Sequence, residues 1–172
     1  MNTPNKLTVF RFLLVPFFLA VAYYERDRSA MIFSTLLFAV ASATDFLDGY
    51  LARKNDLITD FGKFMDPLAD KVLVAAALLF LIQIGRVEAW SVVIIITREY
   101  AISIIRAIAA TNGKVIAASG GGKVKTVLQM SSILMLLLSL PFASMVFYGS
   151  VVMTMYSGIE YIWKNRSLIR EK

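Results

Sequence analysis

The chain contains neither cysteine nor histidine among its 172 residues. Disulfides, thiolate nucleophiles, imidazole acid–base catalysis and zinc held by His or Cys are therefore excluded. Charged residues are also scarce, at 17% of the chain, whereas 58% of the side chains are hydrophobic and the mean hydropathy is +0.69. A typical soluble domain carries about 25% charged residues. This composition predicts an integral membrane protein that has only oxygen ligands to offer a metal.

Basic residues outnumber acidic ones by 18 to 12, which gives a formal net charge of +6. The excess does not form a basic stripe interleaved with aromatic residues, the pattern typical of nucleic-acid-binding proteins. The cations instead separate apolar runs. We therefore expect no nucleic-acid partner and interpret the cations as markers of membrane orientation and as ligands for anions.

Six apolar segments make up a single domain over residues 1–172, without an internal repeat or linker. They are residues 7–24, 30–50, 67–84, 89–110, 124–140 and 144–163. Each approaches the roughly 20 residues that cross a bilayer core. The pattern predicts an all-α, polytopic fold of six transmembrane helices. Most basic residues of the connections fall on one side, so both termini are expected in the cytoplasm.

Three smaller features have competing interpretations. Residues 1–22 have some traits of a secretory signal, but Arg11 inside the apolar run favours a retained helix. The glycine run 120–122 is interpreted as a flexible turn rather than a phosphate loop. Tyr and Trp residues near the segment ends, Tyr161 among them, are expected to anchor the helices at the membrane interface.

Four aspartates lie in or directly beside the second and third segments in one spaced pattern. In order, the pattern reads Asp45, Asp48, Gly49, Ala52, Arg53, Gly62, Asp66 and Asp70. Spacings of three and four residues place the carboxylates of each half on one helix face. A carboxylate in apolar surroundings is costly unless it meets a cation, and four of them favour a bound divalent metal, Mg²⁺, Mn²⁺ or Ca²⁺, over simple pairing with nearby Lys and Arg.

This pattern resembles the signature of the CDP-alcohol phosphotransferase family, and every signature position is filled. The resemblance implies a membrane enzyme, usually a homodimer, in which an alcohol hydroxyl displaces CMP from a CDP-linked lipid. It also implies roles for the residues. The expected metal ligands, for a pair of ions, are Asp45, Asp48, Asp66 and Asp70, of which Asp70 is also the general base. The expected pocket for the cytidine diphosphate group consists of Gly49, Ala52, Arg53 and Gly62.

The acceptor alcohol is predicted from cations outside the signature. These are Arg98, Arg106, Lys123 and Lys125, which gather in or beside the fourth and fifth segments. Arginines inside an apolar segment usually face a polar cavity, and such a cluster suits an acceptor that carries a phosphate. An internal ion pair between Glu99 and Arg106, or snorkelling of Arg106 to the interface, is the structural alternative.

The sequence around these cations resembles that of family members whose acceptor is glycerol 3-phosphate. The resemblance implies transfer of a phosphatidyl group from CDP-diacylglycerol to sn-glycerol 3-phosphate, giving phosphatidylglycerophosphate and CMP, at the cytoplasmic face of a bacterial membrane. Phosphatidylglycerol, serine and inositol phosphate stay open as acceptors. Transport of ions is disfavoured, because the aspartates gather at one face and no inverted repeat is visible.

Overall fold

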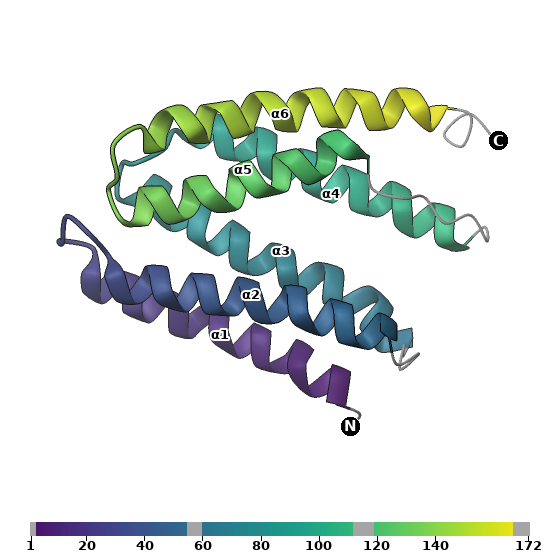
Figure 1. Ribbon diagram of the computed structural model, residues 1–172, viewed down its shortest axis with the longest axis horizontal. Coiled ribbons are helices and arrows are strands. Elements are labelled where there is room, and N and C mark those ends of the chain that lie inside the picture. The colour runs from purple at the N-terminus through teal and green to yellow at the C-terminus, as the bar shows by residue number, and fades with distance from the viewer. Residues whose placement is uncertain (1–2, 55–59, 112–118, 167–172) are drawn as a thin grey trace. The chain divides into compact units, whose positions relative to one another are not determined.

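Six α-helices make up the computed structural model of the chain (Figure 1). They are α1 (Thr3–Glu25), α2 (Ile32–Lys54), α3 (Asp60–Gln83), α4 (Ala89–Thr111), α5 (Gly120–Leu137) and α6 (Ala143–Lys164). The structure describes residues 3–54, 60–111 and 119–166, and the side chains of 12–44, 71–110 and 119–166. These ranges contain no strand, so the all-α prediction is confirmed.

Two predicted connections are largely helical. The polar stretch between the second and third predicted segments is partly helical, because α2 continues to Lys54 and α3 already begins at Asp60. No proline or glycine lies between Arg53 and Phe61 to break a helix. The glycine run was expected to be a turn, but it forms the first turn of α5, where the Gly122 amide donates to Ser119 Oγ at 3.1 Å. A serine at this capping position offsets part of the helix cost of the glycines.

None of the helices is both long and apolar enough to cross a membrane, as far as the described residues go. The six-span topology stays a prediction.

The helices divide between two compact units. The first unit comprises residues 1–86 and 134–140, that is α1, α2, α3 and the end of α5. Its core includes the Phe18 and Phe38 rings, whose centroids lie 6.0 Å apart. The Arg86 guanidinium donates to the carbonyl oxygens of Ser29 at 3.1 Å and Leu137 at 3.3 Å. This side chain therefore ties the turn after α1 to the end of α5.

The turn between α1 and α2 is fixed by a buried carboxylate. Glu25 is fully buried and accepts hydrogen bonds from the amide of Ser34 at 2.8 Å, the hydroxyl of Ser34 at 2.7 Å and the amide of Phe33 at 3.2 Å. Burial raises the pKa of this carboxyl, but the hydrogen bonds outweigh burial and the net pKa lies below the ordinary value. Glu25 at the end of α1 thus caps the first turn of α2.

The second unit comprises residues 87–133 and 141–172, that is α4, most of α5 and α6. Contacts between α4 and α6 run in the same direction along both helices, which are therefore parallel. In order they join Trp90 to Tyr148, Arg98 to Ser157 and Arg106 to Tyr161. On the buried face of α6, the hydroxyls of Ser150, Thr154 and Ser157 donate to carbonyls of their own helix. Such small, internally satisfied residues let helices approach closely.

Candidate functional site

The four aspartates of the signature belong to two consecutive helices of the first unit. Asp45 and Asp48 lie in the last turns of α2, and Asp66 and Asp70 in the first turns of α3. The short segment 55–59 joins the two helices and can span at most roughly 20 Å when extended. The two halves of the signature therefore belong to the same end of the α2–α3 pair (Figure 1).

The side chains of the signature lie outside the described residues. These are Asp45, Asp48, Gly49, Ala52, Arg53, Gly62, Asp66 and Asp70. Their predicted roles stay predictions. Among the side chains that are described, no three His, Cys, Asp or Glu residues gather in a way that could hold a metal ion. Four carboxylates offer the all-oxygen donor set that Mg²⁺ and Mn²⁺ prefer, so the donor chemistry fits these ions.

Two of the four predicted acceptor cations meet in the second unit around one carboxylate, Glu99. The Lys125 ammonium and Arg98 Nη1 both contact Glu99 Oε1, the guanidinium at 3.1 Å. Lys125 is 4% exposed and Arg98 15% exposed in their side chains. Both cations thus share one carboxylate in a largely buried place. Three ionised groups at this depth must satisfy one another or a ligand.

Helix α6 positions Arg98 from the other side. Arg98 Nη2 donates to Ser157 Oγ at 3.1 Å. The absence of a side chain at Gly158 leaves room for Arg98, since a Cβ at position 158 would lie 3.1 Å from Arg98 Cγ. The Nε atom of Arg98 is buried and has no hydrogen-bond partner among the described atoms. A buried guanidinium nitrogen without a hydrogen-bond partner is costly, which favours a ligand that offers a hydrogen-bond acceptor at this position.

The other two predicted cations do not join this buried group. Lys123 is exposed in the first turns of α5. Arg106 is exposed further along α4, and its guanidinium carbon lies 5.5 Å from the centroid of the Tyr161 ring. Tyr161 was expected to be an interfacial anchor, but it is 2% exposed and its hydroxyl has no described partner. Arg98 and Lys125 thus share Glu99, whereas Arg106 and Lys123 are exposed outside this group, and a common phosphate site for the four cations stays a prediction.

The sequence analysis missed the contribution of α6. Besides Ser157 and Gly158, this helix brings Glu160, whose Oε1 pairs with Lys164 at 2.5 Å. Glu160 Oε2 is buried, 2.8 Å from where a Cβ on Gly121 would lie. The spacing of four between Glu160 and Lys164 was a visible signal of an ion pair. The contact with Gly121 has no counterpart in the local sequence, because 39 residues separate the two along the chain (160 − 121).

Comparison with known proteins supports the family prediction. The family model for CDP-alcohol phosphatidyltransferase matches residues 1–156. A Bacillus subtilis protein named CDP-diacylglycerol–glycerol-3-phosphate 3-phosphatidyltransferase is 42% identical over 95% of both chains. A Haemophilus influenzae protein of the same name is 40% identical over 94% of this chain and 91% of its own. A probable phosphatidylglycerophosphate synthase of Mycobacterium tuberculosis is 36% identical over 94% of this chain and 80% of its own. The chain belongs to the CDP-alcohol phosphatidyltransferase family.

Proposed function

We propose that the chain transfers a phosphatidyl group from CDP-diacylglycerol to sn-glycerol 3-phosphate, giving phosphatidylglycerophosphate and CMP. The observation that carries this proposal is the likeness to the Bacillus subtilis enzyme of that name, 42% identical over 95% of the chain. The complete aspartate signature, from Asp45 to Asp70, supports the same reaction class. No protein nucleophile is needed, which agrees with a chain that lacks cysteine and histidine.

The proposed chemistry is a direct displacement at the lipid-bearing phosphorus. The primary hydroxyl oxygen of the acceptor bonds to this phosphorus while the bond to the CMP oxygen breaks, and Asp70 takes the hydroxyl proton. Asp45, Asp48, Asp66 and Asp70 would hold two divalent ions, Mg²⁺ or Mn²⁺. Such ions supply charge neutralisation at the diphosphate. Arg53, with Gly49, Ala52 and Gly62, would bind the cytidine diphosphate group, since a guanidinium pairs well with phosphate oxygens.

The acceptor phosphate is proposed to bind at Arg98 and Lys125. The Arg98 Nε atom, which has no partner among the described atoms, supports this assignment, as does the burial of both cations. Arg106 and Lys123 are proposed to attract the same phosphate from exposed positions on α4 and α5. Charge-assisted hydrogen bonds to phosphate are about twice as strong as neutral ones, which suits recognition of a small anionic acceptor.

We further propose that the helices span the bacterial cytoplasmic membrane, with both termini in the cytoplasm, and that the protein acts as a homodimer. Large apolar side chains are exposed on α1, α2, α4 and α6, for example Leu13, Phe33, Val93 and Val152, each at least 60% exposed. Surfaces of this kind indicate contact with lipid or another chain. A diacyl lipid substrate also requires an enzyme that is seated in or on a membrane.

A panel of acceptors tests the proposed function. The purified chain receives CDP-diacylglycerol and Mn²⁺ with glycerol 3-phosphate, serine, inositol phosphate or phosphatidylglycerol, and released CMP is measured. We expect release that requires glycerol 3-phosphate and stops when a chelator removes the metal. Equal or greater release with another acceptor would reassign the substrate. Release that ignores chelation would contradict the metal mechanism.

A further inference from the structure

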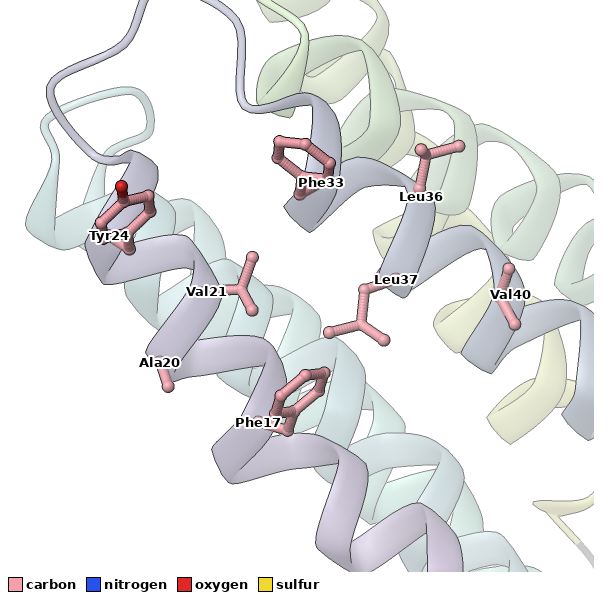
Figure 2. Close-up of a pocket in the computed structure, with 8 residues that line it drawn as sticks. All are labelled: Phe17, Ala20, Val21, Tyr24, Phe33, Leu36, Leu37 and Val40. Carbon is pink, nitrogen blue, oxygen red and sulfur yellow. The ribbon is translucent and has the colours of Figure 1, made fainter.

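An apolar groove of about 620 Å³ separates α1 from α2 in the first unit. It is lined by Phe17, Ala20, Val21, Tyr24, Phe33, Leu36, Leu37 and Val40 (Figure 2). Figure 2 shows the side chains of Phe17, Val21 and Leu37 converging in the space between the two helices. The Tyr24 hydroxyl is the only polar side-chain group of the lining. The groove thus fits an aliphatic ligand, and its volume lies within the roughly 300–1,000 Å³ of ligand pockets.

A cation lies at one end of this groove. The guanidinium carbon of Arg28 is 5.8 Å from the centroid of the Tyr24 ring, and Tyr24 lines the groove at the end near the α1–α2 turn. The acidic residues of the turn have contacts of their own: Glu25 is buried against Ser34 and also feels the charge of Arg28, and Asp27 Oδ2 lies 3.6 Å from Arg26 Nε. An apolar groove with a cation at its mouth complements a ligand with an acyl chain and an anionic head group.

The groove is held open by the fold. Glu25 fixes the first turn of α2 to the last residue of α1, and the Met31 amide donates to the Leu137 carbonyl at 2.9 Å. Both contacts flank the Arg28 end of the groove. A preformed site loses little conformational entropy when a ligand binds, which favours specific over non-specific binding.

We propose that this groove binds one anionic phospholipid, with an acyl chain between α1 and α2 and the phosphate at Arg28. The head-group end of this groove is remote from the proposed transfer site. Phe33, at the Arg28 end, and Asp48 both belong to α2 and lie roughly 22 Å apart along its axis at 1.5 Å per residue. The lipid bound here is therefore not the substrate poised for transfer. The proposal does not depend on the identity of the acceptor alcohol.

Native mass spectrometry of the full chain tests the site. Detergent-solubilised protein receives equal amounts of phosphatidylglycerol and phosphatidylcholine with identical acyl chains, and the retained lipid is identified. We expect one lipid per chain and about a five-fold preference for phosphatidylglycerol, since one arginine near an anionic head group contributes about that factor. Glycerol 3-phosphate without acyl chains should not displace it. Equal retention of the two lipids overturns the proposal.

Two variants with matched controls locate the lipid. Arg28→Gln should abolish the preference, whereas Arg28→Lys and Arg26→Gln, the latter in the same turn, should keep it. Val21→Phe fills the groove and should lower retention of both lipids, whereas Val152→Phe on exposed α6 should not. Loss of preference in Arg26→Gln, or undiminished retention in Val21→Phe, overturns the proposal. The proposal is also overturned if the unaltered protein is a dimer without bound lipid and Val21→Phe makes it monomeric. In that case a second copy of the chain occupies the groove.

Activity separates this proposal from the proposed function. Arg28→Gln should keep acceptor-dependent CMP release within about two-fold of the unaltered chain, because the change is remote from the transfer residues. If the unaltered chain releases no CMP, the proposed function is contradicted. The lipid preference can still be measured in that case, so the two proposals fail independently.

Discussion

The Lys125 ammonium on α5 and the Glu99 carboxylate on α4 form a buried ion pair, and Glu99 also holds Arg98. Removing Glu99 takes the shared carboxylate away from both cations, whereas removing Lys125 leaves Glu99 with Arg98. We therefore expect Glu99→Gln to lower the free energy of unfolding by about 3–5 kcal/mol and Lys125→Met by less.

Denaturant titration of the detergent-solubilised protein measures both changes. Glu88→Gln, at an exposed position before α4, is the matched control and should stay within about 0.5 kcal/mol of the unaltered chain. The double variant should cost less than the sum of the single ones, since the two residues share one interaction. Additive losses would show that the pair is not coupled.

Gly158 and Gly149 lie on the same helix but in different surroundings. A Cβ at Gly158 would lie 3.1 Å from Arg98 Cγ, whereas one at Gly149 would meet nothing within 4 Å. We expect Gly158→Ala to displace the guanidinium by a few tenths of an ångström and to raise the KM for glycerol 3-phosphate roughly three-fold. Gly149→Ala should leave this KM unchanged and stabilise the protein by roughly 0.5–1 kcal/mol. Equal KM values in the two variants would remove Arg98 from the acceptor site.

Arg106 is exposed and stacks over the ring of Tyr161. Arg106→Ala should raise the KM for glycerol 3-phosphate about ten-fold, with kcat nearly unchanged, because it removes a cation that binds the ground state and the transition state alike. Tyr161→Phe keeps the ring and removes only a hydroxyl without a described partner, so it should behave as the unaltered enzyme. Steady-state kinetics with varied glycerol 3-phosphate concentration measures both variants. An unchanged KM in Arg106→Ala would contradict the proposed role of Arg106 in binding the acceptor phosphate.

Asp70 is proposed as the proton acceptor as well as a metal ligand. Asp70→Asn should lower kcat by at least about 100-fold, the usual contribution of a general base. The Mn²⁺ concentration that half-saturates the residual activity should change less in Asp70→Asn than in Asp45→Asn. Titration of CMP release with Mn²⁺ measures both variants. Identical metal dependence in the two would argue against separate roles.

Glu25 predicts a pH dependence of stability. Its pKa is lower in the folded state, so its contribution is fully present above the ordinary pKa of 4.5 and is lost as the pH falls through the lower folded-state value. Glu25→Gln should therefore lower the free energy of unfolding by about 1–3 kcal/mol at pH 7. Below pH 4.5 the difference from the unaltered chain should narrow. Thermal unfolding at pH 7 and pH 4 checks this; a gap that widens in acid would contradict it.

The helices were predictable because the length of an apolar run in the sequence indicates where a helix begins and ends. The predicted segment 89–110 corresponds to α4, Ala89–Thr111, within one residue at its end. Helix ends in polar sequence were less predictable, as at Asp60, because polar residues suit both a loop and a helix. The glycine run misled for a related reason, since Ser119 caps a helix there that the glycines alone disfavour.

The reaction class was readable along the chain, because the signature depends on residue types at fixed spacings within two helices. The surroundings of the proposed acceptor cations were readable only in part. The cations were visible in the sequence, but their partners Glu99, Ser157 and Gly158 come from separate helices. Local spacing carries no information about which helix faces meet. The charge balance around Arg98 was therefore decided by packing.

The amino-acid sequence by itself was thus sufficient to predict six helices and membership of a transferase family, and to limit any metal site to oxygen ligands. Only the folded chain placed the Arg28 guanidinium beside Tyr24 and opened an apolar groove between α1 and α2. Hydropathy says that a helix face is apolar, but not whether a neighbouring helix covers it. Whether such a face is covered depends on the crossing of two helices, which the Glu25 contacts at their shared turn help to set.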